Sequence, residues 1–272
     1  MQHALLAGFL GGIACSVVGV LVVSMQLSFI GVSISHAAFA GAIIAVFAGF
    51  DPLFGAFVFS LAAAAAIGPL ADRGEFKPDT SLGIVFSLMI GLSFLFMGLI
   101  PGPKTEVLNL MWGSILTVND LDLIILGVIA VLVVGTMVLF FKEVQAIVFN
   151  REIALSVGLH ASWIFYGLMF LTGLTVAASL RPIGGLLIFS LILNPAAAAY
   201  QLTYNLKRLF ILAAVFGVFS CWTGLALSYL FNLPSGAAIV VLSTLIFLVA
   251  NAFSPKRKVK RVETAAEVER DA

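Results

Sequence analysis

The sequence predicts an all-α protein embedded in a membrane as a polytopic bundle of transmembrane helices. Hydrophobic residues make up 62 % of its 272 positions and charged residues only 10 %, whereas a soluble domain typically carries about 25 % charged residues. Mean hydropathy is +1.17, and apolar stretches recur at about the 20-residue length that a spanning helix needs. We therefore expect a transmembrane domain over residues 1–253 and a disordered cytosolic tail over 254–272, basic and then acidic.

Nine apolar segments are long enough to cross a membrane. In chain order they are residues 4–25, 30–50, 52–71, 80–100, 121–141, 161–180, 183–200, 208–231 and 237–253. Glycine or proline interrupts the second and the seventh of these segments. The number of spans is therefore eight if one of the two is re-entrant.

Turn residues mark the connections between the segments. Asp51-Pro52 separates the second and third spans, Pro101-Gly-Pro-Lys104 follows the fourth, and Leu233-Pro-Ser-Gly236 precedes the last. Residues 105–121 are too short and too interrupted for a further span. Trp112 within them suits the membrane interface.

Basic residues set the orientation. With nine spans, all but two of the 14 Lys and Arg residues fall on the side of the C-terminal tail, and only Lys104 and Arg181 fall on the other. Because basic residues concentrate on the cytoplasmic side of a membrane, we expect the N-terminus outside and the C-terminus inside.

Residues 29–41 depart from the simple apolar pattern. On this interpretation, His36 is the only ionisable side chain within the long apolar segments. An ionisable group at membrane depth is costly, so His36 is a candidate functional site. On a helix, Ser33 shares the face of His36, while Ser35 lies on a neighbouring face with Phe39. Imidazole is a common ligand for transition metals. The alternative is a neutral histidine that is hydrogen-bonded to a serine or a carbonyl and packs two helices.

A second interrupted segment lies in the other half of the chain, after residue 179. Paired interrupted segments in the two halves of a transporter indicate its pathway, although the similarity between the two is weak and no repeat is inferred. The candidate pathway or gating residues of the two segments are Gly31, Gly41, Arg181, Gly184, Gly185 and Pro195.

The loop 142–160 contains a short helix with both ends marked. Asn150 can cap its N-terminus, Glu152 suits its first turn, and Gly158 can end it. Such a helix on the cytosolic side is either a docking element or a linker.

Several catalytic and energy-coupling motifs are absent from the sequence. It contains no G-x-x-x-x-G-K-[ST] for ATP phosphates, no H-E-x-x-H for zinc and no G-x-S-x-G for a nucleophilic serine. We also read the spans as free of Asp, Glu and Arg, the usual residues of proton or sodium coupling. Transport is then either passive or driven by a partner ATPase. Cys15 and Cys221 are expected to be inert core residues.

Five motifs in order resemble the membrane permease of ATP-binding-cassette importers of the zinc, manganese and iron class. The resemblance covers nearly the whole chain. The motifs are Ser35-His-Ala-Ala-Phe-Ala-Gly41, Asp79-Thr-Ser-Leu-Gly-Ile-Val-Phe-Ser87, Trp112-Gly-Ser-Ile-Leu116, Ser179-Leu-Arg-Pro-Ile-Gly-Gly-Leu-Leu187 and Leu233-Pro-Ser-Gly-Ala-Ala-Ile239.

The resemblance implies an assembly of several subunits. A second permease copy completes a homodimer, two cytosolic ATP-binding subunits supply energy, and an extracytoplasmic metal-binding protein delivers the cargo. Residues 152–159 resemble the cytosolic helix that docks into the ATPase groove, with Asn150-Arg151-Glu152 in place of the family's D-P-E. The expected docking residues are Asn150, Arg151, Glu152, Leu155 and Gly158.

One position departs from the family pattern. The family commonly has Asp four residues before the histidine, and this chain has Val32 there. Divalent transition metals favour mixed nitrogen and oxygen ligands, so Ser33, Ser35, water or the partner copy completes the shell around His36, or the cargo differs.

We therefore expect a permease subunit in a prokaryotic cytoplasmic membrane that moves zinc, manganese or iron inward by alternating access. The metal is cargo, no resident cofactor is expected, and the chain is not itself an enzyme. Membrane lipid surrounds the chain, and nucleic acid is not a partner. The alternatives are a permease for a chelated metal such as a siderophore or cobalamin and, from another class, an intramembrane enzyme.

Overall fold

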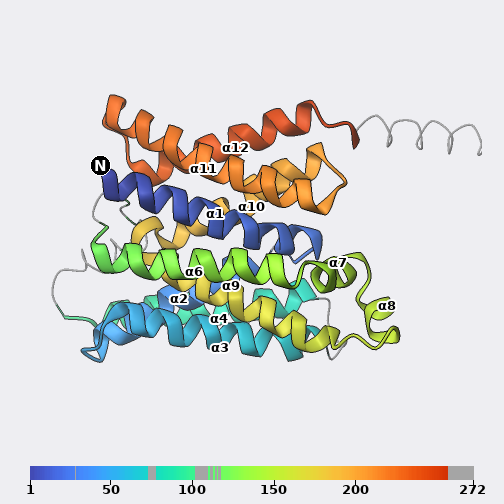
Figure 1. Cartoon of the computed structure of the whole chain (residues 1–272). Helices are drawn as coiled ribbons and strands as arrows, with labels where there is room; N and C mark the ends of the chain where they lie inside the picture. The colour runs from blue at the N-terminus through green and yellow to red at the C-terminus, as the bar shows by residue number, and fades with distance from the viewer. Residues whose placement is uncertain are drawn as a thin grey trace, which may run out of the picture.

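The computed structural model describes residues 1–27, 29–72, 78–101, 110, 113, 115 and 118–256. Within these ranges the chain forms eleven α-helices and no strand (Figure 1). Nine of them are long and correspond to the nine predicted segments: α1 (Gln2–Ser24), α2 (Ile30–Phe47), α3 (Pro52–Asp72), α4 (Pro78–Leu99), α6 (Asp120–Leu139), α9 (Ala161–Ile183), α10 (Gly185–Leu202), α11 (Leu206–Phe231) and α12 (Ser235–Ala252).

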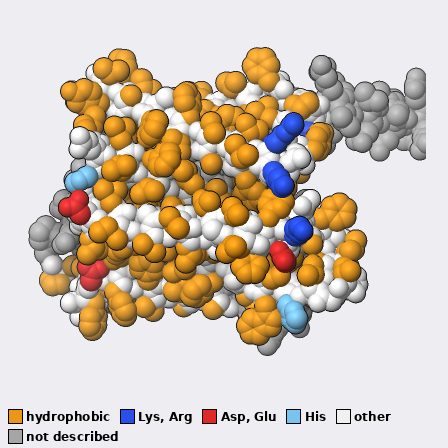
Figure 2. Space-filling view, in the orientation of Figure 1, with side chains coloured by type: hydrophobic (Ala, Val, Ile, Leu, Met, Phe, Trp, Pro, Cys, Tyr) orange, Lys and Arg blue, Asp and Glu red, His pale blue; other side chains and the backbone are white. Residues whose placement is uncertain are grey.

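The long helices run roughly side by side and alternate in direction along the chain (Figure 1). α1 and α2 are mostly buried within the bundle, whereas α4 and α12 are mostly exposed. In the space-filling view, apolar side chains cover the flank of the bundle and the charged ones gather at its two ends (Figure 2). An apolar flank between two polar ends is the surface that a lipid bilayer requires, so the chain is a multi-pass membrane protein.

The number of membrane crossings stays a prediction. Among the described residues, seven helices are long and apolar enough to cross a membrane, while the apolar parts of α3 and α10 are shorter, at Pro52–Ile67 and Leu187–Leu202. Residues 30–47 of the first interrupted segment form one helix, α2, and in the second α10 continues through Pro195 after the break at Gly184.

Glycines bring pairs of helices into backbone contact. A Cβ atom added to Gly41 of α2 would collide with the carbonyl oxygen of Gly55 in α3, and one added to Gly55 would collide with that of Gly41. Gly12 of α1 meets Gly217 of α11 in the same way. Small residues at such crossings allow the close approach that stabilises helix pairs in membranes. Gly41, a predicted pathway residue, therefore has a clear packing function.

The break between α9 and α10 depends on Gly184. Its backbone has φ +95° and ψ 141°, a conformation that side chains other than glycine's disfavour. Gly113, which also has a positive φ of 66°, packs directly against the backbone of Ile183 and Gly184. The predicted interruption at Gly184 is confirmed.

The loop predicted over 142–160 contains more helix than expected. α7 (Phe141–Phe149) precedes the short helix α8 (Arg151–Ser156), and the two lie at one end of the bundle (Figure 1). α7 buries Val144 and Ile147, which stand three residues apart on one helix face. The spacing of Val144 and Ile147 is the signal in the sequence that indicates this additional helix.

Candidate functional site

His36 lies half-buried on α2, at the contact with α4. Its ring meets Phe86 edge to face, with 4.9 Å between ring centroids and 82° between ring planes. The Nδ1 atom of His36 is buried and has no hydrogen-bond partner among the described residues. A buried polar atom without a partner costs free energy, so this imidazole lacks the hydrogen bond at Nδ1 that a purely structural histidine would be expected to make.

Ser33 shares the α4-facing side of α2 with His36, as the spacing predicts. Its Oγ donates to the carbonyl oxygen of Leu82 at 2.9 Å and is 3.1 Å from that of Phe29. Leu82 lies one turn before Phe86, the ring that contacts His36. Ser33 is fully buried, and its hydroxyl proton is used in holding α2 to α4.

Ser35 takes a different direction. Its Oγ donates to the carbonyl oxygen of Gly31 at 2.6 Å, one turn back along the same helix, and the side chain is buried. Both candidate supporting hydroxyls therefore already bond to backbone carbonyls.

A complete metal site is not formed by the described residues of one chain. They contain no group of three or more His, Cys, Asp or Glu side chains placed to hold a metal ion. Val32, one turn before His36, is partly exposed on the same face. The arrangement thus offers one imidazole on a partly open face, and the described residues supply no group of His, Cys, Asp or Glu side chains that would complete a metal site around it.

The two interrupted segments lie against each other. A Cβ atom at Gly31 of α2 would lie 3.5 Å from Phe189 and 3.8 Å from Ile192 of α10. At the start of α10, a Cβ atom at Gly185 would lie 3.7 Å from Phe39 on α2. The segments that the sequence analysis paired as pathway candidates are therefore neighbours in space.

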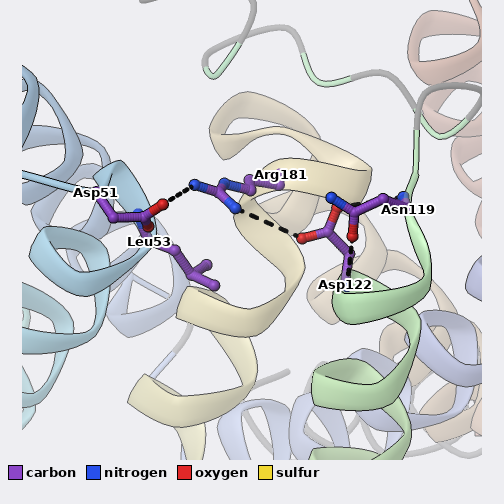
Figure 3. A network of polar contacts seen from close by, with 5 residues as sticks. All are labelled: Asp51, Leu53, Asn119, Asp122 and Arg181. Atoms are coloured by element: carbon purple, nitrogen blue, oxygen red, sulfur yellow. Dashed lines mark hydrogen bonds and ion pairs between the residues drawn. The ribbon is translucent and has the colours of Figure 1, made fainter.

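Arg181 joins three parts of the bundle (Figure 3). It lies where α9 ends and α6 begins, at the end opposite α7 and α8 (Figure 1). Its guanidinium donates to Oδ2 of Asp51 at 2.7 Å and lies 3.8 Å from Oδ1 of Asp122. Asp51 stands in the connection before α3, Arg181 in the last turn of α9, and Asp122 in the first turn of α6. We call these three residues the Arg181 clamp.

Both carboxylates of the Arg181 clamp also cap a helix. Oδ1 of Asp51 accepts from the backbone N–H of Leu53 at 2.7 Å, and Asp122 forms a reciprocal capping box with Asn119. Burial raises the pKa of Asp51, but the hydrogen bonds from Arg181 and from the N–H of Leu53 outweigh it and hold the pKa below 3.8. The clamp therefore holds an ionised Asp51 at neutral pH.

The expectation that the membrane spans contain no Asp, Glu or Arg is wrong for the first turn of α6 and the last turn of α9. Asp122 lies within the predicted span 121–141 and is only 6 % exposed, and α9 extends past residue 180 to include Arg181. His36 is thus not the only ionisable side chain in these segments. The pattern Asn119-x-x-Asp122 indicates in the sequence that a helix starts there and that Asp122 belongs to its first turn, since Asn followed three residues later by an acidic residue marks a helix start.

The short helix α8 has the predicted caps. Oδ1 of Asn150 accepts from the N–H of Ile153 at 3.1 Å. Gly158 adopts φ +83°, and its N–H donates to the carbonyl of Leu155 at 3.0 Å. The side chains of Arg151 and Glu152, two predicted docking residues, lie outside the described part of the structure.

Apolar side chains are exposed around α8. Ile153 is 52 % exposed, Leu155 47 % and Val157 72 %. Beside them a cavity of about 350 Å³ opens between α7 and α8, with Phe149 among its lining residues. An apolar patch at the polar end of a membrane protein is a surface suited to a protein partner.

The family assignment rests on nearly the whole chain. The ABC 3 transport family matches residues 1–254. The chain belongs to this family. The matched region includes the His36 segment, the Arg181 clamp and α8, and it confirms the resemblance carried by the five motifs.

Relatives of this ABC 3 family member align along most of their length. The manganese transport system membrane protein MntC of Listeria monocytogenes is 35 % identical over 257 residues, which are 94 % of this chain and 91 % of that protein. The manganese import system permease protein ScaB of Streptococcus gordonii is 30 % identical over 258 residues, or 95 % and 92 %.

A solved structure shows the same fold. PsaBC from Streptococcus pneumoniae, in complex with Fab, superimposes with a TM-score of 0.84 at 29 % sequence identity, covering 96 % of this chain and 94 % of that chain. The helical bundle described above is therefore the fold of an ABC 3 membrane subunit.

Proposed function

We propose that the chain is the permease subunit of an ATP-binding-cassette importer that brings a divalent metal ion into a prokaryotic cell across the cytoplasmic membrane. The observation that carries this proposal is the family match over residues 1–254. The names of the two relatives above favour manganese among the candidate ions; zinc and iron are the other candidates.

His36 is the proposed cargo contact. Its imidazole lies on a partly open face, and Nδ1 has no partner among the described residues. One nitrogen ligand per chain holds a metal only weakly, and a pathway site has to release its ion as well as capture it. A second permease copy would bring a second His36, which would raise the number of protein ligands without any carboxylate.

The energy source is proposed to be a separate ATPase that docks on α8. Exposed Leu155 and Val157 beside the cavity between α7 and α8 give it an apolar surface to bind. ATP-driven closure of two such subunits would move α8 and α7, and α9 would transmit that movement because it packs on both of them. Gly184 then offers a flexible joint between α9 and α10, next to the His36 segment.

The proposed orientation places α7, α8 and the chain after α12 in the cytoplasm. Lys142 belongs to α7, and Lys207 and Lys256 line a groove with α7 residues; the Arg181 clamp lies at the opposite end, where α6 begins and α9 ends (Figure 1). An extracytoplasmic metal-binding protein would then approach the side of the Arg181 clamp.

A permease for a chelated metal is the second candidate. Val32 stands where a carboxylate would, and the described residues contain no group of three or more His, Cys, Asp or Glu side chains that could hold a metal ion. Such a site suits a cargo that arrives with ligands of its own.

The test is uptake by proteoliposomes that contain the chain, its cognate ATPase and the matching binding protein. We expect manganese uptake that requires ATP and all three components, and no ATP hydrolysis by the purified chain alone. Uptake of a ferric chelate but not of free manganese, zinc or iron would favour the second candidate. ATP hydrolysis by the isolated chain would contradict both.

A further inference from the structure

A groove of about 590 Å³ opens at the end of the bundle where α7 lies. Its walls come from the end of α1, from α7, from the connection between α10 and α11, and from the chain after α12. Among the described residues that line it, none is Asp or Glu, and two are lysines, Lys207 and Lys256. In the space-filling view, basic side chains gather near this end of the visible face (Figure 2).

Aromatic rings hold both ammonium groups in place. The Nζ atom of Lys256 lies 3.6 Å from the ring centroid of Tyr200 and 4.4 Å from that of Tyr204, and Nζ of Lys207 lies 5.4 Å from the ring of Phe141. Ring faces attract a cation but carry no net charge. In the described part of the chain neither lysine pairs with a carboxylate, so the groove keeps an excess of positive charge.

An apolar stripe leads from the groove along the bundle flank. From Lys207, every fourth residue of α11 is exposed and apolar: Ile211 at 64 %, Val215 at 55 % and Phe219 at 53 %. Residues at this spacing share one helix face. A molecule with a negative head at Lys207 and a hydrocarbon chain would match both features at once. Basic pockets beside transmembrane helices are known to hold anionic lipid headgroups.

We propose that this groove is a binding site for the phosphate headgroup of an anionic phospholipid, with an acyl chain lying along the Ile211, Val215 and Phe219 stripe. Lys207 and Lys256 neutralise the phosphate, and the tyrosine rings suit the interfacial depth at which the headgroup lies. Burial lowers the pKa of Lys256 from 10.5, as expected for a cation without a counter-charge, and a bound phosphate would offset this. This proposal requires only that the chain is embedded in a membrane, and it does not depend on the proposed transport function.

The test is a titration of the purified full-length chain, in uncharged detergent, with phosphatidylglycerol or phosphatidylcholine, followed by thermal stability. We expect phosphatidylglycerol to stabilise the chain and phosphatidylcholine to have much less effect. Lys207→Gln and Lys256→Gln should each weaken phosphatidylglycerol binding roughly fivefold, and together roughly 25-fold, because each basic group near a membrane surface contributes about that factor. Arg208→Gln is the matched control: it removes a neighbouring charge that does not line the groove, and it should change the affinity far less.

Three other outcomes would overturn the proposal. Equal binding by wild type and the Lys207→Gln/Lys256→Gln variant would show that the lipid binds elsewhere. Equal stabilisation by glycerol phosphate, which lacks acyl chains, would assign the groove to a soluble phosphate compound. Loss of ATPase association with unchanged lipid binding in the double variant would assign it to a protein partner.

Substitutions in the apolar stripe test independently whether the acyl chain lies along it. Ile211→Gln/Val215→Gln should weaken phosphatidylglycerol binding while leaving any weak binding of glycerol phosphate unchanged. An unchanged phosphatidylglycerol affinity in this variant would contradict the proposed path of the chain.

Discussion

His36 is half-buried, and its buried Nδ1 atom has no hydrogen-bond partner among the described residues. These two properties distinguish a candidate metal ligand from a histidine that only packs two helices. A packing histidine that is lost leaves its partner unsatisfied, at a cost of about 1–3 kcal/mol. His36 has no such partner at Nδ1 among the described residues. Its loss should therefore affect transport more than stability.

The first prediction compares His36→Ala with Ser33→Ala. His36→Ala should abolish metal uptake while thermal stability in detergent stays close to that of wild type. Ser33→Ala should lower the free energy of unfolding by about 1 kcal/mol, because the carbonyl of Leu82 loses its donor. Normal uptake by His36→Ala would end the ligand hypothesis and leave the family assignment intact.

Val32→Asp provides a directional test of the same site. The new carboxylate would stand one turn from His36 on the same face and supply the oxygen ligand that divalent metals favour. We expect tighter manganese binding, seen as a larger metal-induced thermal shift, together with slower turnover because release is impeded. Val32→Asn controls for polarity, and an identical metal response in both variants would count against a site at His36.

The Arg181 clamp gives a prediction for pH. Because the pKa of Asp51 is depressed in the folded state, its interaction stabilises the fold above the unfolded pKa and is lost as pH falls through the folded pKa. Arg181→Gln should therefore lower stability at pH 7 by about 1 kcal/mol, a modest value because Asp51 is 60 % exposed and screened by solvent. The difference from wild type should shrink below about pH 4. Thermal unfolding from pH 3 to 8 measures this, and a difference that stayed constant with pH would assign the effect to packing.

At the scale of elements, the short helix α8 and the residue after it expose apolar side chains, which make it the proposed docking site for the ATPase. Leu155→Asp should abolish ATPase association and metal uptake without unfolding the bundle, because it places a charge in the proposed interface. Leu155→Met, which keeps an apolar side chain, should retain both. Co-purification of the ATPase with each variant is the measurement. Full association of Leu155→Asp would show that α8 is only a linker.

The elements also show what a sequence can and cannot predict. All nine long helices follow from apolar stretches of span length, because burial in lipid depends on composition more than on neighbours. The caps of α8 were predictable from Asn150 and Gly158, because capping is local. The Arg181 clamp was not, since Asp51 and Asp122 are far from Arg181 in sequence. The ring of Phe86 beside His36 likewise depends on how α2 and α4 pack.

At the scale of the whole molecule, orientation can be tested by labelling with a membrane-impermeant thiol reagent in intact cells. Phe50→Cys lies at the same end of the bundle as the Arg181 clamp and should react with the reagent from outside the cell. Tyr204→Cys lies at the groove and should react only after the membrane is permeabilised. The native Cys15 and Cys221 are both buried and should stay unlabelled, which makes wild type the control. The reverse labelling pattern would invert the proposed orientation.

The backbone contact between Gly41 and Gly55 limits how the proposed transport pathway can open. Sliding α2 by one helical turn along α3 would put the methyl group of Ala37 or Ala45 where Gly41 now has only hydrogen, against the carbonyl of Gly55. The two helices are therefore locked in register. Any motion that exposes His36 first to one side of the membrane and then to the other therefore has to move α2 and α3 together.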